Sequence, residues 1–306
     1  MKKMVGKTNK ARSVFLTVAA VLVIVFIILP LIFSVFDRSK TGNVALIPIT
    51  GAITGDGGKF LGTSTVSSNI VVDYIKEADE NKQIKVILLE INSPGGSAVA
   101  SDEIASAVKK AKKPVVALIR EAGASGAYWI ASAADHIIAN RMSITGSIGV
   151  ISSYLEFSGL MKEYGVGYEK LVAGERKDIG TPFRKLDDSE KKILQSKLDK
   201  IHLFFIKEVA ENRNLSLSDV ESLATGEFYL GIEAYYLGLV DQLGDKDTAE
   251  EYIKDNYKLE KIDYLVYERK ASIFDIFSNV FSDFFFKIGE GFGSILVSKE
   301  NNLMLV

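Results

Sequence analysis

The sequence contains no cysteine, and this absence removes several kinds of chemistry at once. A chain of 306 residues without cysteine can form no disulfide, bind no metal through a thiolate and use no cysteine nucleophile. Only two histidines are present, His136 and His202, and their positions do not form a ligand pair. A Cys–His metal site is therefore excluded, whereas a site made only of carboxylates stays open.

Over most of the chain, positive charges are outnumbered by negative ones. The formal net charge is −2, yet the first 12 residues hold five lysine and arginine side chains and no acidic one, so the remainder is distinctly acidic. A protein that binds nucleic acid normally carries a basic stripe. The sequence has neither a glycine-rich phosphate loop ending in Lys-Ser or Lys-Thr nor an HExxH motif. We therefore expect no nucleic-acid partner, and no motif here indicates a phosphate-bearing cofactor or a zinc site.

One long apolar run lies near the N-terminus. Residues 14–36 contain no charged side chain, and a helix needs about 20 apolar residues to cross a bilayer. The basic segment 1–13 precedes this run, so the positive-inside rule predicts a cytoplasmic N-terminus and an extracytoplasmic remainder. A cleaved signal peptide is the alternative, but its apolar core is usually only about 7–15 residues long. We expect a retained transmembrane anchor at 14–36, a single pass through the cell membrane and hence a lipid bilayer as a partner.

Beyond residue 43, predicted strands alternate with predicted helices. Residues 55–68 are rich in glycine, serine and threonine and are expected to form a loop. The alternation predicts an α/β fold with buried strands, organised as one domain over 43–260. Strands are expected at 44–53, 84–91, 114–119, 136–139, 144–153, 168–172 and 262–267, and helices at 69–81, 98–110, 158–164 and 188–212.

The segment from Glu121 to Asp135 has the features of a nucleophile site. It follows the strand at 114–119 and becomes helical where small and apolar residues recur at helical spacing. Ser125 therefore lies at a helix start, where unpaired backbone N–H groups and the helix dipole stabilise negative charge. Gly126 lets a substrate approach the backbone. These features suit a nucleophilic serine beside an oxyanion-binding amide, although a helix N-cap serine has the same pattern.

A second junction between a strand and a helix strengthens this interpretation. The strand at 84–91 runs into Asn92-Ser-Pro-Gly-Gly-Ser97, and a Gly-Gly turn before a helix aims backbone N–H groups into a pocket. Gly96 and Gly126 could then supply two donors around a carbonyl that Ser125 attacks. An ordinary strand-to-helix connection is the alternative for this motif taken alone.

Three motifs in this order resemble the signal peptide peptidase SppA family. They are Ile91-Asn-Ser-Pro-Gly-Gly-Ser97, Ala124-Ser-Gly-Ala-Tyr-Trp129 and Thr145-Gly-Ser-Ile-Gly149. The resemblance covers roughly residues 43–244 and implies a fold of layered β-α units, like that of the Clp protease catalytic subunit and the crotonases. Two positions depart from the family pattern: Ala127 stands where a glycine is usual, and Glu227 where a basic residue is usual.

The resemblance also implies a Ser–Lys dyad. Neither histidine is a convincing base for Ser125, and composition cannot choose a base among 37 lysines and arginines. The family's lysine stands in a Lys-Asp-Ile segment ahead of a long helix, which corresponds to Lys177. A family serine that orients this lysine corresponds to Ser147. Gly96 and Gly126 would form the oxyanion hole, and no cofactor or metal would be needed.

The function implied by the resemblance is that of a membrane-anchored serine endopeptidase. Substrates in the family are cleaved signal peptides and other membrane-derived hydrophobic peptides. Short members, which like this chain carry one copy of the core, form homo-oligomers whose sites are shared between subunits. Two other classes stay open: a crotonase-like acyl-CoA enzyme, and an inactive scaffold that binds membrane proteins. Retention of both Ser125 and Lys177 speaks against the scaffold.

The C-terminal segment 261–306 is expected to hold a strand followed by an amphipathic tail. Isoleucine, valine and phenylalanine recur at helical spacing within residues 273–288. Such a face could pack on the domain or a neighbouring subunit, or it could lie on a membrane surface. The pattern does not choose between these alternatives.

Overall fold

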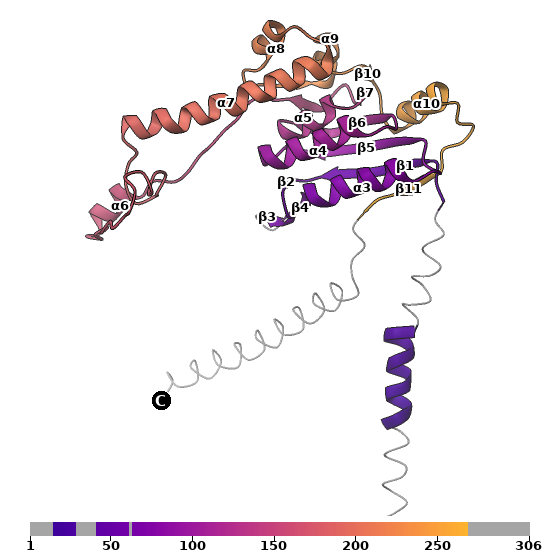
Figure 1. Ribbon diagram of the computed structural model, residues 1–306, viewed down its shortest axis with the longest axis horizontal. Coiled ribbons are helices and arrows are strands. Elements are labelled where there is room, and N and C mark those ends of the chain that lie inside the picture. Colours follow the sequence, from indigo (N-terminus) through magenta and orange to yellow (C-terminus); the bar gives the residue numbers. More distant parts are fainter. Residues whose placement is uncertain (1–14, 29–40, 61–62, 269–306) are drawn as a thin grey trace, which may run out of the picture. The chain divides into compact units, whose positions relative to one another are not determined.

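A computed structural model describes residues 15–28, 41–60 and 63–268 of the chain (Figure 1). Residues 15–23 are α-helical and continue into a π-helical segment, η1 (Ile24–Ile28). Within these described ranges, no helix combines the length and apolarity that a membrane crossing requires. The remainder of the expected anchor at 14–36 and most of the tail within 261–306 lie outside the described residues. The membrane anchor and the tail helix therefore remain predictions.

The main domain is built on an eight-stranded sheet in which most neighbours run parallel. Its strand order is β10-β7-β6-β5-β1-β11. Strand β8 pairs parallel with the C-terminal residues of β6, and β9 pairs antiparallel with β8. The central strands are buried, as expected for parallel strands rich in valine, isoleucine and leucine. The expected α/β fold is thus confirmed as a mixed, mostly parallel one. The strands are β1 (Val44–Thr50), β5 (Val86–Ser93), β6 (Val115–Ala124), β7 (His136–Ala139), β8 (Ile144–Gly146), β9 (Phe228–Leu230), β10 (Gln242–Leu243) and β11 (Tyr264–Val266).

Helices cover the sheet. Apolar residues recur at helical spacing in the helices that pack on it, so these helices bury an apolar face against the strands. Alternate residues of β1, β5, β6 and β7 form a core cluster with Ala249 and Ile253 of α10, so α10 covers one face of the sheet. Helices α3, α4 and α5 pack side by side against β1, β5 and β6 (Figure 1). The helices are α3 (Ser68–Glu80), α4 (Ala98–Lys110), α5 (Gly126–Ser132), α6 (Ser158–Glu163), α7 (Asp188–Arg213), α8 (Leu217–Leu223), α9 (Gly231–Tyr236) and α10 (Lys246–Tyr257).

The loop expected at 55–68 is partly a small second sheet, so that prediction is wrong for this part. The sheet has the order β2-β4-β3, formed by β2 (Ile53–Thr54), β3 (Gly58–Phe60) and β4 (Thr63–Ser67). Threonine and valine favour extended backbone, and the hydroxyls of Thr54 and Thr65 lie 3.2 Å apart in a hydrogen bond across the sheet. Ile53 also forms a parallel bridge with Gly96, which ties this sheet to the Gly95-Gly96 turn.

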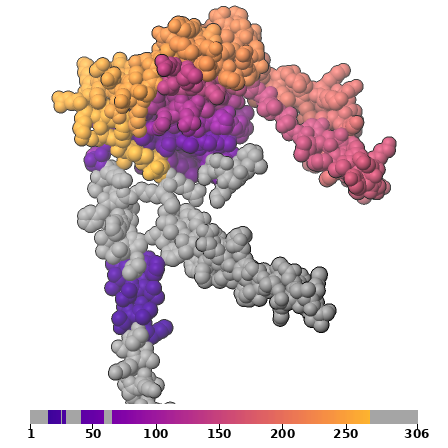
Figure 2. Space-filling view, turned by 180° about the vertical axis from the view of Figure 1, so that it is seen from behind, coloured from indigo at the N-terminus to yellow at the C-terminus, as the bar shows by residue number. Residues whose placement is uncertain are grey.

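The segment between β8 and α7 differs from the sequence prediction. The strand expected at 144–153 ends at Gly146, because Ser147 has a φ of 50° and leaves the extended conformation. The strand expected at 168–172 is absent from the described structure, where Leu171 is 98% exposed and these residues pair with none of the described strands. In two opposite views, α6 and the first turns of α7 extend beyond the layers of the sheet (Figure 1, Figure 2). We call residues 150–184 the arm.

Candidate active site

Ser125 joins β6 to α5 in an unusual backbone conformation. Its φ and ψ are 53° and −125°, in a region that costs a non-glycine residue on the order of 1–3 kcal/mol. The Ser125 amide donates a hydrogen bond of 2.8 Å to the Gly146 carbonyl, and the Ser125 carbonyl accepts one of 3.0 Å from the Trp129 amide. Ser125 holds the N-cap position of α5, but its hydroxyl accepts no hydrogen bond from the helix. A capping role therefore does not explain this serine.

The turn at Gly95 and Gly96 packs directly against this junction. A methyl group added to Gly95, whose φ is +99°, would lie 2.9 Å from the Ser125 Cβ. A methyl group added to Gly96 would lie 2.1 Å from the Ile53 carbonyl oxygen. Real Cβ atoms do not approach neighbours this closely, so both positions require glycine. The two motifs predicted to cooperate are brought together by this close backbone packing.

The amides of Gly96 and Gly126 lie together beside Ser125. Gly126 is the first residue of α5, and the first amides of a helix have no partner within it. The bridge to Ile53 uses the Gly95 carbonyl and the Ser97 amide, so the Gly96 amide takes no part in it. A Cβ added to Gly126 would lie 3.4 Å from the Gly96 nitrogen. Among the described residues neither amide has an acceptor, and together they are suited to bind an oxyanion.

An apolar cavity of about 310 Å³ adjoins Ser125, Gly96 and Gly126. Two aromatic rings in its wall, Trp129 of α5 and Phe205 of α7, stack with centroids 4.7 Å apart. A cavity with an apolar wall and a few polar groups at one end is typical of a site that accepts an apolar side chain. The other apolar side chains of the wall come from the arm and from α7: Val150, Ile151, Leu198 and Ile201.

Ser147 lies at the end of the neighbouring strand. Its hydroxyl donates a hydrogen bond of 3.1 Å to the Gly226 carbonyl, and its amide donates one of 3.0 Å to the Glu227 carbonyl. Because β8 pairs with β6, Ser147 and Ser125 follow two adjacent strands. The described contacts of Ser147 do not include Lys177, so its expected role in orienting the lysine stays a prediction.

Lys177 lies in a run of turns at residues 175–180, where its amide donates a hydrogen bond of 3.1 Å to the Gly174 carbonyl. The Lys177 side chain is exposed and does not line the cavity beside Ser125. For the described residues, no hydrogen bond or ion pair of its ammonium group is found. Contacts within one chain therefore do not join Lys177 to Ser125.

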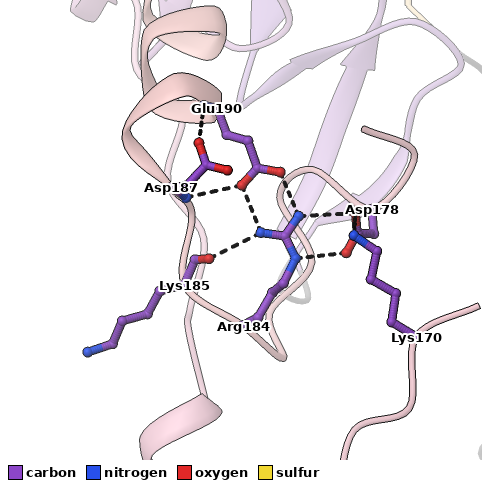
Figure 3. A network of polar contacts seen from close by, with 6 residues as sticks. All are labelled: Lys170, Asp178, Arg184, Lys185, Asp187 and Glu190. Atoms are coloured by element: carbon purple, nitrogen blue, oxygen red, sulfur yellow. Dashed lines mark hydrogen bonds and ion pairs between the residues drawn. The ribbon is translucent and has the colours of Figure 1, made fainter. Parts of the chain in front are cut away.

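A charged network that sequence reasoning missed holds the turn of Lys177 (Figure 3). Arg184 donates hydrogen bonds to the carboxylates of Asp178 and Glu190, and these bonds hold the pKa of both carboxyls below their usual values. Glu190 also forms a capping box with Asp187 at the start of α7. The spacing Asp-x-x-Glu before an apolar run is a known capping-box signature, so this part of the network could have been found from sequence.

In the part of the chain that the structure describes, both histidines are engaged with groups other than Ser125. His136 stacks on Tyr252 with ring centroids 3.7 Å apart and shares a hydrogen bond of 3.2 Å with Gln242. His202 lies 3.2 Å from the Ile148 carbonyl. Among residues 15–28, 41–60 and 63–268, no three histidine, aspartate or glutamate side chains gather closely enough to hold a metal ion.

Comparison with known families identifies the kind of protein that carries this site. The model of peptidase family S49 matches residues 107–260, a range that includes Ser125, Ser147 and Lys177. The chain belongs to peptidase family S49. As an S49 protein of the SppA family it is a serine peptidase, and the resemblance seen in the three motifs is confirmed.

Individual relatives support the same assignment over most of the chain. A protein of Methanocaldococcus jannaschii named "Putative protease" is 34% identical over 233 residues, which span 75% of this S49 chain and 74% of the relative. A protein of Enterococcus faecium named "Putative signal peptide peptidase SppA" is 34% identical over 243 residues, or 78% of this chain and 70% of the relative. "Protease 4" of Haemophilus influenzae is 32% identical over 220 residues, but these span only 35% of its length.

Proposed function

We propose that this S49 peptidase is a Ser–Lys endopeptidase with Ser125 as nucleophile and Lys177 as general base. The observation that carries the proposal is the placement of Ser125, held at positive φ beside the Gly96 and Gly126 amides at an apolar cavity. A serine hydroxyl needs a base to become an effective nucleophile. A lysine can serve as that base where its surroundings disfavour the charged form.

The chemistry then follows from these four residues. Neutral Lys177 takes the proton of the Ser125 hydroxyl while Oγ attacks the peptide carbonyl. The N–H groups of Gly96 and Gly126 bind the oxyanion of the tetrahedral intermediate, and losing one such donor typically costs about 10²–10³ in rate. Protonated Lys177 gives its proton to the leaving amine. Water, with Lys177 again as base, hydrolyses the acyl-enzyme on Ser125.

We place the Lys177 of a neighbouring subunit at each Ser125. In support, Lys177 is exposed and does not line the cavity of its own chain. The arm that carries it also exposes several large apolar side chains, and clustered exposed apolar surface is typical of protein interfaces. A homo-oligomer in which the arm packs on the next copy would bury this surface and complete the site. The exposed apolar side chains of the arm include Ile151, Leu155, Leu160, Tyr164, Val166 and Leu171.

Membrane anchoring and the substrate class belong to the same proposal. An anchor at 14–36 would hold the catalytic domain at the outer face of the cell membrane, close to peptides released there. The apolar wall of the cavity supports cleavage after an apolar side chain. The Enterococcus relative carries the name of a signal peptide peptidase. We therefore propose cleaved signal peptides and other hydrophobic, membrane-derived peptides as substrates.

A serine-reactive fluorophosphonate probe and a fluorogenic hydrophobic peptide test the dyad together. Wild type should be labelled and should cleave the peptide, whereas Ser125→Ala should do neither. Lys177→Ala and Lys177→Arg should both be inactive while folded, because a guanidinium stays protonated and cannot act as a base. Full peptide turnover by Lys177→Ala would overturn the dyad. Hydrolysis of acyl thioesters without peptide cleavage would instead favour an acyl-CoA enzyme.

Mixed oligomers test the sharing of sites. Ser125→Ala chains keep Lys177, and Lys177→Ala chains keep Ser125, so some sites of a mixed oligomer would hold both groups. Mixing the two inactive variants should restore part of the wild-type activity. Failure to restore activity, with each variant shown to assemble like wild type, would place both groups of the site on one chain.

A further inference from the structure

Arg184 uses every donor of its side chain to join the turn of Lys177 to the start of α7 (Figure 3). A guanidinium has five N–H donors. Nε and Nη2 bind the Asp178 carboxylate at 2.7 and 3.0 Å, and Nη1 and Nη2 bind the Glu190 carboxylate at 2.7 and 2.6 Å. The remaining Nη1 donor binds the Lys185 carbonyl at 3.2 Å. Such bidentate, charge-assisted contacts fix geometry as well as adding attraction.

Both carboxylates are shielded from solvent, although the arm around them is exposed. The side chains of Asp178 and Glu190 are 8% and 5% exposed, and that of Arg184 is 26% exposed. Lys170 adds a second cation to Asp178, with Nζ 2.6 Å from Oδ1. Buried charges need such partners. The network therefore joins the arm to α7 through buried carboxylates and differs from a solvated charge cluster.

The network acts on the backbone at two places that follow Lys177 in the chain. Asp178 follows Lys177 directly, and the Asp178 carbonyl accepts a hydrogen bond of 3.0 Å from the Thr181 amide. At the other end, Glu190 accepts from the Asp187 amide at 3.1 Å, and the Glu190 amide donates to Asp187 at 2.8 Å. The first turn of α7 and the turn of Lys177 are thus held by one side chain, that of Arg184.

We propose that Arg184 is a positioning residue, which fixes the turn of Lys177 against α7 so that the Lys177 amino group is presented to Ser125. This inference rests on the proposed Ser–Lys dyad. Arg184 touches neither substrate nor reacting atoms. Its effect is to hold the base in one place, and a displacement of about 1 Å in a catalytic group can cost roughly 10²-fold in rate.

Mixed oligomers separate this role from a general effect on folding, because Arg184 should matter only in the chain that supplies Lys177. In the reference mixture, Ser125→Ala chains supply Lys177 to Lys177→Ala chains. Adding Arg184→Ala to the Ser125→Ala chain should lower the restored activity about 10²-fold. Adding Arg184→Ala to the Lys177→Ala chain should leave it unchanged. Equal losses in both mixtures, or no loss in either, would overturn the proposal.

Limited trypsin digestion gives a second readout that needs no activity and no shared site. In a Ser125→Ala background, Arg184→Ala should speed cleavage after Lys177, and Arg184→Lys should restore part of the protection because it keeps one cation for the carboxylates. Lys191→Ala is the matched control, since it removes a cation whose ion pair with Asp188 is exposed. Unchanged cleavage after Lys177 in Arg184→Ala would contradict the proposal, whatever the source of the base.

The two readouts distinguish a failure of this inference from a failure of the dyad. Peptide turnover by Lys177→Ala would refute the dyad, and Arg184 would then have no base to position. Inactive Lys177→Ala together with fully active Arg184→Ala would leave the dyad intact and refute the role of Arg184. If Arg184→Ala acts by misplacing Lys177, kcat should fall while KM stays close to wild type, because the cavity walls are unaltered.

Discussion

The Ser125 amide donates a 2.8 Å hydrogen bond to the Gly146 carbonyl, which joins the end of β6 to the end of β8. The residue after each strand is a serine with positive φ, 53° at Ser125 and 50° at Ser147. The two serines with positive φ thus stand directly after the paired ends of β6 and β8. The orientation of the nucleophile therefore depends on β8 as well as on the strand and helix that it joins.

Substitution of Ser147 separates backbone strain from the role of its hydroxyl. Ser147→Gly removes the strain of the positive φ, whereas Ser147→Ala keeps that strain. Both variants lose the hydrogen bond to the Gly226 carbonyl, which is worth about 1 kcal/mol. Thermal unfolding should therefore find the glycine variant more stable than the alanine variant. If the hydroxyl orients Lys177, both variants should lose peptidase activity to a similar extent. A fully active glycine variant would show that peptidase activity needs neither the Ser147 hydroxyl nor the backbone strain at this position.

The two oxyanion glycines should respond differently to alanine. A methyl group at Gly96 meets the backbone of Ile53, which cannot move aside, while one at Gly126 meets the Ser101 hydroxyl at 2.2 Å. Alanine keeps the backbone N–H, but the clash displaces that amide from the oxyanion, so each variant should lose about 10²–10³ in kcat. Adding Ser101→Ala removes that hydroxyl, so it should restore part of the activity of Gly126→Ala and none of that of Gly96→Ala. Equal rescue of both would contradict the geometry described for this site.

Trp129 provides a direct reporter of cavity occupancy, because it is the sole tryptophan of the chain and lines the cavity. A peptide aldehyde with an apolar side chain forms a hemiacetal with a nucleophilic serine and should fill the cavity. Its binding to wild type should shift the tryptophan emission, and Ser125→Ala should show a much weaker shift. Inhibition of peptide cleavage without any change in emission would place the substrate side chain elsewhere.

Loss of one cavity wall should change both stability and selectivity. Phe205 is 1% exposed and stacks on Trp129, and removal of a buried phenylalanine ring typically costs about 3–5 kcal/mol. Phe205→Ala should therefore lower the unfolding midpoint, and the enlarged cavity should favour peptides with a larger apolar side chain. Relative kcat/KM values for alanine, leucine and phenylalanine peptides measure this shift. An unaltered ranking in folded Phe205→Ala would argue against the cavity as the selective site.

The charged network should make the arm sensitive to acid. Hydrogen bonds from Arg184 lower the folded-state pKa of Asp178 and Glu190 relative to ordinary carboxyl values of 3.8 and 4.5. The stabilisation is therefore complete above these ordinary values and is lost as the pH falls through the folded-state values. Unfolding midpoints between pH 7 and pH 3 should decline less steeply in Glu190→Gln than in wild type. The control, Asp188→Asn, alters an exposed carboxylate and should follow wild type.

Local patterns were enough to predict much of the fold. Helix α4 and strand β7 have the bounds that the sequence predicts, and α7 ends one residue later than predicted. Each carries its signal within its own residues, as an apolar face or a short buried run. The strand expected at 168–172 had only Leu171 and Val172 as an aliphatic pair, and a strand also needs a neighbour, which is set by tertiary structure.

The candidate site also has a part that local sequence predicts and a part that depends on tertiary structure. Ser125, Gly96 and Gly126 could be predicted because each lies at a junction of a strand and a helix, where backbone geometry follows from local sequence. Arg184 could not, since its importance depends on Asp178 and Glu190 being turned toward one guanidinium and shielded from water. In sequence these residues look like any polar loop.

The pairing of β1 with β11 has a consequence for synthesis of the chain. Val44 of the first strand lies beside Tyr264 of the last strand in the sheet, and Asn43 accepts a hydrogen bond from the Asp263 amide, 220 residues later. During translation β1 can pair with β5 early, but its other edge has no partner until almost the whole domain has left the ribosome. A chain that stops short of Tyr264 would leave that edge unpaired, and an unpaired edge strand is a template for aggregation.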